Sequence, residues 1–330
     1  MNDPHHVGHA IVSPAIEDSM KNELRYWSAL FVLGVLCWGT SFFWIKMALP
    51  EIGPFEIVSL RLLICSLLLW MFVLLGRHRV PSGAGVIAKL IVVGIVSMTL
   101  PFLFVCVAET RITSSVAGII NGTAPMFTMV LAAVSTREEN FTGTKFASLA
   151  VGFAGLLFVT SSNGGFEKIA DGVSHNLIML AVPMCYAIGG VLTRLWLKDL
   201  QPLVTATVSV TGAMVATMAL QICMGTSIKM PTSPTIWAAM LWMGAVSTAL
   251  AYILYFYLIQ NWGASRASLV SYTSPISALI LGTNFLGENF DWRVIAGVIL
   301  ILASVFFASP RAAQLAASSR LWRSAPSNHR

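Results

Sequence analysis

The residues of this 330-residue chain that could do chemistry form no catalytic or metal-binding motif. The sequence has no Walker motif, no paired-carboxylate site, no Ser-His-Asp order and no His/Cys metal cluster. His5, His6 and His9 lie in a polar lead at 1–26, but their spacing matches no zinc site. We therefore expect a protein that is not an enzyme and needs no cofactor or metal, and a membrane enzyme is the least favoured alternative.

The composition explains where the remaining polar residues must act. The chain is 56% hydrophobic and only 10% charged, with a mean hydropathy of +0.78, whereas soluble chains are about 25% charged. A membrane-spanning helix needs roughly 20 mostly apolar residues. Such stretches recur along the chain and predict an all-α integral membrane protein with ten transmembrane helices. The predicted spans are 27–49, 55–76, 86–108, 114–135, 144–161, 175–197, 203–225, 236–259, 267–286 and 292–309.

The distribution of basic residues predicts the orientation. With an even number of spans both termini share one face, and most of the 20 lysines and arginines fall on that face. The positive-inside rule then places both termini in the cytoplasm. The net charge of +6 is thus a topology signal, and we expect the basic tail at 310–330 to lie near anionic lipid, with no nucleic-acid partner.

The two halves of the chain repeat each other. TSSVAGIINGTAP at 113–125 and GASRASLVSYTSP at 263–275 share Ser, Ala, Thr and Pro at an offset of 150. CWGTSFFWIKMALPEIGP at 37–54 aligns with CYAIGGVLTRLWLKDLQP at 185–202 at an offset of 148. Each half has five helices, an odd number, so the second copy enters the membrane from the opposite face, as in transporters built from inverted repeats. The predicted units are the lead at 1–26, repeats at 27–161 and 175–309, and the tail at 310–330.

Three motifs give the chain a family resemblance. They are WGTSFFWIK at 38–46, LRLLICSLLLW at 60–70 and SRASLVSYTSPISALILGTNFLGE at 265–288, while STREE at 135–139 departs from the pattern by lacking the Gly. Over 24–309 the chain resembles the drug/metabolite transporter superfamily, in the branch with two EamA-type repeats. The resemblance implies a ten-helix bundle with a central cavity, alternating access, and export of a metabolite across a bacterial inner membrane.

Four prolines inside predicted spans indicate where the cavity lies. Proline removes a main-chain donor and bends a helix, which frees carbonyl groups to line a cavity. The alternative is that proline is simply frequent in membrane helices. The residues concerned are Pro101, Pro125, Pro183 and Pro275.

Aromatic and small polar residues of the same spans form the predicted binding site. Tyrosine in mid-span is poorly explained by an interfacial belt, so we expect an aromatic wall of Trp38, Tyr186, Tyr252 and Tyr272. The alternative is that these rings only pack helices together. We expect a small polar or zwitterionic solute, an amino acid or a related amphiphilic metabolite. Its hydrogen bonds would come from Thr40, Ser41, Asn121 and Ser271.

Charged residues near the span ends leave two alternatives open. Lys46 and Arg61 could snorkel to the outer interface, with Glu51 and Glu56 as partners, or they could contact the substrate or a gate. Glu109 ends the third span, and we expect it to form an outer-surface pair with Arg111 rather than a site.

The absence of Asp or Glu in the middle of any predicted span bears on energy coupling. We expect facilitated diffusion or exchange, or proton coupling only through Glu109 or Glu56. The sequence thus predicts a secondary transporter exporting a small metabolite as a monomer or homodimer. An importer of the same fold, and a non-transporting membrane sensor or scaffold, are the alternatives.

Overall fold

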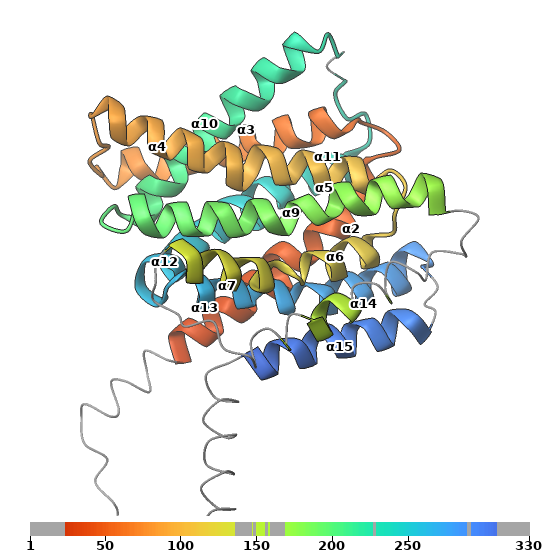
Figure 1. Cartoon of the computed structure of the whole chain (residues 1–330). Coiled ribbons are helices and arrows are strands. Elements are labelled where there is room, and N and C mark those ends of the chain that lie inside the picture. Colours follow the sequence, from red (N-terminus) through yellow and green to blue (C-terminus); the bar gives the residue numbers. More distant parts are fainter. Residues whose placement is uncertain are drawn as a thin grey trace, which may run out of the picture.

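The computed structural model describes residues 24–135, 147, 150–155, 158, 169–226, 229–288 and 292–308, and over these it is helical without strands. The helices run side by side across one bundle (Figure 1). The first half contains η1 (Val32–Trp38), α2 (Gly39–Ala48), α3 (Pro54–Leu75), α4 (Ala84–Gly94), η2 (Ile95–Thr99), α5 (Leu100–Glu109), α6 (Ser114–Asn121) and α7 (Ala124–Ser135). The second half contains α9 (Ile169–Trp196), α10 (Pro202–Cys223), α11 (Pro234–Gly244), η3 (Ala245–Leu250), α12 (Ala251–Trp262), α13 (Ala264–Ala267), η4 (Ser268–Tyr272), α14 (Ser274–Leu286) and α15 (Trp292–Ala308).

Seven helices of the described part are long and apolar enough to cross a membrane, which confirms the all-α membrane fold. The ninth and tenth predicted spans coincide with the shorter α13–α14 and α15. Most of the fifth predicted span, the lead at 1–23 and the tail at 309–330 lie outside the described residues. The seven spans are Leu24–Ala48, Pro54–Leu75, Ala84–Glu109, Ser114–Ala132, Ser174–Trp196, Pro202–Cys223 and Pro234–Trp262.

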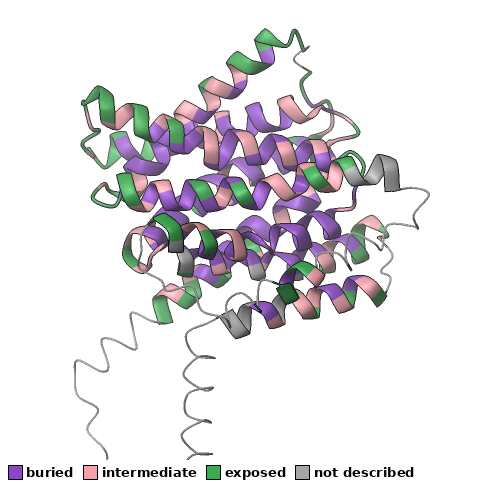
Figure 2. Cartoon of the chain, viewed as in Figure 1, coloured by how far each residue is buried: buried purple, intermediate pink, exposed green. Residues whose placement is uncertain are grey.

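The bundle is buried along its middle and apolar outside. Figure 2 shows buried residues concentrated where the helices face one another, with exposed residues on outward faces and at helix ends. Many outward residues are large and apolar, such as Leu67, Leu75, Val215 and Ile222, which are each more than half exposed. Because a bilayer core offers no hydrogen bonds, these faces suit contact with lipid tails.

The two ends of the bundle need names. We call the end with the turns at 49–53, 110–113 and 229–233 the Glu51 end. The end with the turns at 76–83 and 197–201 is the Asp199 end. The predicted orientation makes the Glu51 end extracytoplasmic.

Two wide helical turns occupy equivalent places in the two repeats. The π-helices η2 and η3 follow Gly94 and Gly244, and both include a G-x-V-S sequence at an offset of 150. A π-turn interrupts the regular hydrogen-bond ladder and is common at functional sites. Here the Ser97 carbonyl accepts a hydrogen bond from the Tyr252 hydroxyl, and the Ser247 carbonyl accepts one from Arg61. Both wide turns therefore offer a main-chain acceptor to a side chain.

The glycines before these turns allow a close crossing between repeats. A Cβ on Gly94 would lie 2.0 Å from the carbonyl oxygen of Ser209 on α10. A Cβ on Gly244 would lie 2.6 Å from the Cγ2 of Ile64 and 3.2 Å from the carbonyl oxygen of Arg61, both on α3. Arg61 and Ser209 are themselves equivalent at the offset of 148. The third helix of each repeat thus packs against the second helix of the other.

We expect Gly94→Ala to destabilise the protein by about 1–3 kcal/mol, because the added methyl group overlaps a main-chain oxygen that cannot move without shifting α10. Thermal unfolding in detergent, followed by size-exclusion chromatography, measures the effect. Gly85→Ala is the matched control on α4, since a Cβ there has nothing within 4 Å. Equal stability of the two variants would contradict the close crossing.

Candidate functional site

A small pocket lies in the middle of the bundle, lined by eight residues of the first repeat and by Tyr186 of the second. Its volume is about 20 Å³, room for about one water molecule, whereas sites that hold small organic ligands measure about 300–1,000 Å³. The bundle is therefore closed around this pocket. The lining residues are Trp38, Ser41, Phe42, Ile45, Arg61, Phe102, Val105, Asn121 and Tyr186.

Arg61 is the charged group of this pocket. It lies on α3 with 2% of its surface exposed. Its Nε donates to the Thr248 hydroxyl at 2.5 Å, Nη1 to the Ser41 hydroxyl at 3.0 Å and Nη2 to the Ser247 carbonyl at 3.0 Å. The guanidinium carbon also lies 3.9 Å from the centre of the Phe102 ring, a cation–π contact.

The contacts of Arg61 separate the two alternatives left by the sequence. The guanidinium does not reach the interface, and its hydrogen-bond partners are neutral. The predicted pairing with Glu51 or Glu56 is wrong, because Glu51 binds the two residues before α11 and Glu56 accepts from Gln221 on α10. A position seven residues into α3 is too deep for the side chain to snorkel once neighbouring hydroxyls hold it.

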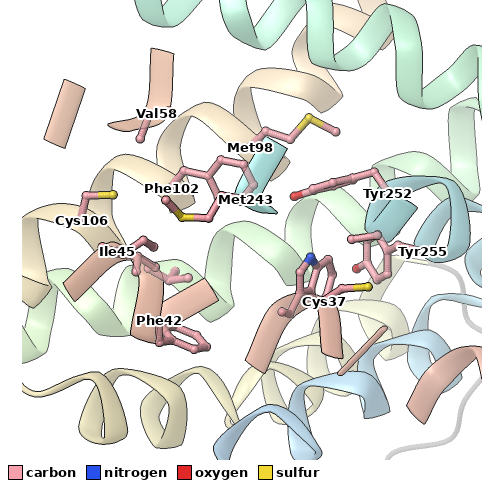
Figure 3. Close-up of a cluster of buried hydrophobic side chains, with 14 of the residues drawn as sticks. Cys37, Phe42, Ile45, Val58, Met98, Phe102, Cys106, Met243, Tyr252 and Tyr255 are labelled. Atoms are coloured by element: carbon pink, nitrogen blue, oxygen red, sulfur yellow. The ribbon is translucent and has the colours of Figure 1, made fainter. Parts of the chain in front are cut away.

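Three of the four predicted aromatic residues meet at Trp38. Its ring stacks on Tyr186 with centroids 5.5 Å apart and planes 15° apart, and meets Tyr252 edge-on at 5.9 Å. Tyr255, which lies outside the predicted wall, joins at 5.0 Å. Figure 3 shows Tyr252 and Tyr255 extending toward the middle of the cluster from α12. The side chain of Tyr272 lies outside the described part.

The predicted polar residues divide into two groups. Ser41 and Asn121 line the pocket, and the amide oxygen of Asn121 is buried without a hydrogen-bond partner. Trp38 Nε1 is likewise buried and unpartnered. Thr40 points elsewhere, accepting from Trp242 Nε1 at 3.0 Å. Ser271 is buried on η4 and does not line the pocket.

Three of the four prolines lie at or near a change in helix geometry. Pro125 follows the break between α6 and α7, and Pro275 begins α14 after the 3-10 turn η4. Pro101 follows the π-turn η2, whereas Pro183 lies inside the continuous α9. A Cβ on Gly122 would lie 3.3 Å from the Cγ of Pro275, so the breaks of the fourth and ninth spans pack together.

A second polar cluster closes the Glu51 end. Lys46 Nζ donates to the carbonyl oxygens of Glu109 at 2.6 Å and Ile112 at 2.7 Å. Glu109 itself is fully buried, and neither of its carboxylate oxygens has a hydrogen-bond partner. The predicted surface pair with Arg111 is therefore wrong, because α5 turns the carboxyl group into the bundle.

Glu288, which follows α14 in the second repeat, binds the start of α6 in the first. Its Oε1 accepts from the main-chain N–H and the hydroxyl of Ser114, both at 2.8 Å. Its Oε2 accepts from the N–H of Ser115 at 3.1 Å and from that residue's hydroxyl. A carboxylate at a helix N-terminus satisfies free N–H groups and complements the helix dipole.

Glu51 makes the reciprocal contact, from the first repeat to the second. Its carboxylate accepts from the N–H groups of Thr232 and Ser233, at the start of α11. The hydrogen bond from Ser233, then that from Thr232, holds the pKa of Glu51 below its ordinary value of 4.5. The depressed pKa means that this contact is present at neutral pH and is lost as the pH falls through the lowered value.

Some residues of the site gave a signal that sequence reasoning missed. The repeated G-x-V-S at 94–97 and 244–247 could have located the two π-turns, and with them the acceptor for Arg61. Phe102, beneath the guanidinium, gives no such signal, because an isolated Phe in an apolar helix is ordinary.

Two helical repeats of opposite topology that form one bundle define a class of membrane protein, the transporters with inverted repeats. The chain belongs to the EamA-like transporter family, whose model matches residues 25–161 and 174–309, one match for each half. It is thus a multi-pass membrane transporter that works on a small molecule in a lipid bilayer.

Similar proteins agree with this assignment. The chain is 24% identical to an uncharacterized transporter of Archaeoglobus fulgidus, over 86% of this chain and 98% of that protein. It is also 24% identical to the uncharacterized inner membrane transporter YedA of Escherichia coli K12, over 86% and 90%. A solved crystal structure with 18% identity has the same fold, with a TM-score of 0.65 over 87% of this chain and 98% of that one.

We expect Lys46→Met to lower stability by about 2 kcal/mol, because it removes two charge-assisted hydrogen bonds that tie α2 to the turn after α5. The thermal unfolding midpoint in detergent measures the change. Lys229→Met is the matched control, an exposed lysine at the same end. The role of Lys46 would be refuted if both variants unfolded at the wild-type temperature.

Proposed function

We propose that this protein is a secondary transporter that exports a small polar or amphiphilic metabolite, such as an amino acid or a related compound, by alternating access. The observation that carries the proposal is the central pocket, lined by the first repeat and by Tyr186 of the second. It combines a buried guanidinium, an unpartnered amide oxygen and a pair of stacked aromatic rings. Groups of these three kinds bind the charged, polar and apolar parts of an amphiphilic solute.

The difference between the two ends supports a direction of opening. At the Glu51 end, Glu51 and Glu288 each cap a helix of the opposite repeat. At the Asp199 end the residue equivalent to Glu51 is Asp199, which lines a surface cavity of about 340 Å³. A described hydrogen bond across this end, from His78 to Gln201 at 2.9 Å, is exposed, and Tyr26 and Trp27 also contact the ring of Trp262 there. We infer that the Asp199 end opens with fewer hydrogen bonds to break, and that it faces the cytoplasm.

Two other functions use the same fold. An importer would load the pocket from the Glu51 end, and a sensor or scaffold would bind a ligand or partner without moving it. The arrangement favours export over import through the clamps at the Glu51 end. The arrangement favours transport over sensing, because the pocket lies midway between two ends that are closed by different numbers of hydrogen bonds.

We expect cells with and without the protein to differ in the medium concentration of one or a few small polar metabolites. Purified protein in liposomes should move the solute that metabolite profiling identifies. Asn121→Ala should slow this flux roughly fivefold, because the pocket loses a buried hydrogen-bonding group. Thr283→Ala is the control, since that hydroxyl binds its own helix at Leu279 on an exposed face.

The same liposomes test energy coupling. If a pH gradient drives the flux, Glu109→Gln should remove that dependence while leaving solute exchange. Binding without flux would favour a sensor, and wild-type flux by folded Asn121→Ala would exclude the pocket. A dependence on the pH gradient that survives in Glu109→Gln would overturn the coupling role.

The orientation makes a separate prediction. In a Cys223→Ser background, which removes an exposed native thiol, a cysteine at Met230 should react with a membrane-impermeant maleimide in intact cells. A cysteine at Val80, at the Asp199 end, should react only after the cells are opened. Both positions are exposed, so burial does not confound the comparison. The reverse labelling pattern would show the opposite topology and would contradict the proposed direction of export.

A further inference from the structure

We propose that the transported solute carries a carboxylate, and that Arg61 binds it. The proposal rests on the proposed transport function and names the class of its substrate: a small amphiphilic monoanion or a zwitterion. It follows from the charge, the free donors and the neighbours of the Arg61 guanidinium.

The first argument is the missing counter-charge. Arginine is always ionised in proteins, and a buried charge in a membrane is costly unless an opposite charge or many hydrogen bonds compensate it. Arg61 is 2% exposed, and its bonded partners are two hydroxyls and one carbonyl. Within the described residues none of them is anionic. A solute with one negative charge would supply the compensation that the protein does not.

The second argument is the number of unused donors. A guanidinium has five N–H groups, one on Nε and two on each terminal nitrogen. The three observed bonds use one group on each nitrogen, which leaves one N–H on Nη1 and one on Nη2. Two donors on neighbouring nitrogens suit the two oxygens of a carboxylate. The Phe102 ring against the guanidinium keeps the group in place.

The third argument is the rest of the pocket. The buried amide oxygen of Asn121 is an acceptor without a donor, which suits an ammonium or amide group on the solute. The stacked rings of Trp38 and Tyr186 offer a flat apolar surface. The equivalent of Arg61 in the second repeat is Ser209, so the duplication supplies one cation rather than two. A single positive charge balances a carboxylate, whereas a phosphate dianion would keep one negative charge that is not balanced.

The test uses probes that share an apolar part within each set and differ in the charged groups they carry. One set is 3-phenylpropionate, phenylalanine and phenethylamine, and a second, straight-chain set is hexanoate, norleucine and hexylamine. Binding to the purified full-length protein is measured by the shift of its thermal midpoint, and flux is measured in liposomes. In at least one set, we expect the acid or the amino acid to bind about tenfold or more tightly than the amine. Phenyl phosphate should bind more weakly than 3-phenylpropionate.

Variants then assign the effect to Arg61. Arg61→Gln should abolish the preference for the carboxylate, and Arg61→Lys should retain the sign of the preference but weaken it, because it keeps the charge without the fork of donors. Arg194→Gln is the matched control, a partly buried arginine that donates to the Gln260 carbonyl outside the pocket. It should bind as the wild type does. Because the charge series is measured on wild-type protein, a misfolded Arg61 variant does not block the test.

The outcomes separate this proposal from transport itself. Carboxylate-selective binding without flux would keep the site and remove the transport function. Flux of the amines at equal or greater affinity would keep transport and overturn the role of Arg61. Tighter binding of phenyl phosphate than of 3-phenylpropionate would indicate that Arg61 binds a phosphate group, and this would overturn the proposal. Failure of all probes to bind folded protein would also overturn it.

Discussion

Burying the guanidinium of Arg61 inside an apolar bundle is the constraint around which the middle of this protein is organised. A charge there is costly unless neighbouring groups accept hydrogen bonds from it, yet the regular helix consumes its own carbonyls. The π-turn η3 resolves this by offering the Ser247 carbonyl and the Thr248 hydroxyl together. That turn lies against α3 only because Gly244 leaves room beside Arg61 and Ile64. One buried cation is thus held by two polar residues of the other repeat, on a wide turn that the close approach at Gly244 brings against it.

The duplication gives a symmetric scaffold to a site that is not symmetric. Both repeats keep the glycine, the π-turn and the crossing of third helix on second helix. The equivalent positions that face the pocket or its ends have diverged: Arg61 is matched by Ser209, Glu109 by Ile259, Glu51 by Asp199 and Trp38 by Tyr186. Backbone packing is therefore shared, and the chemistry is carried by substitutions on one copy. An asymmetric solute needs such a site, because its charged and apolar parts cannot bind equivalent groups.

Hydropathy and the internal repeat predicted the spans well, because both signals are properties of long stretches. Of the predicted binding residues, Trp38, Ser41, Asn121 and Tyr186 line the central pocket and Tyr252 packs against Trp38, while their role in binding stays a prediction. What failed was the direction of single side chains. Thr40 is one residue from Ser41 yet faces α11, and Glu109 turns inward although it ends a span. A change of about 100° per residue decides which way a helical side chain points, and the π-helix η1, which ends at Trp38, shifts that angle just before Thr40 and Ser41.

The small volume of the central pocket has a consequence for the membrane as a whole. A space for about one water molecule cannot hold a column of water, and protons and hydrated ions cross a bilayer protein along such columns. Within the described part of the bundle, this pocket therefore offers no continuous path of water from one face to the other. A cell can keep many copies of it in an energised membrane without short-circuiting the ion gradients on which its other transporters depend.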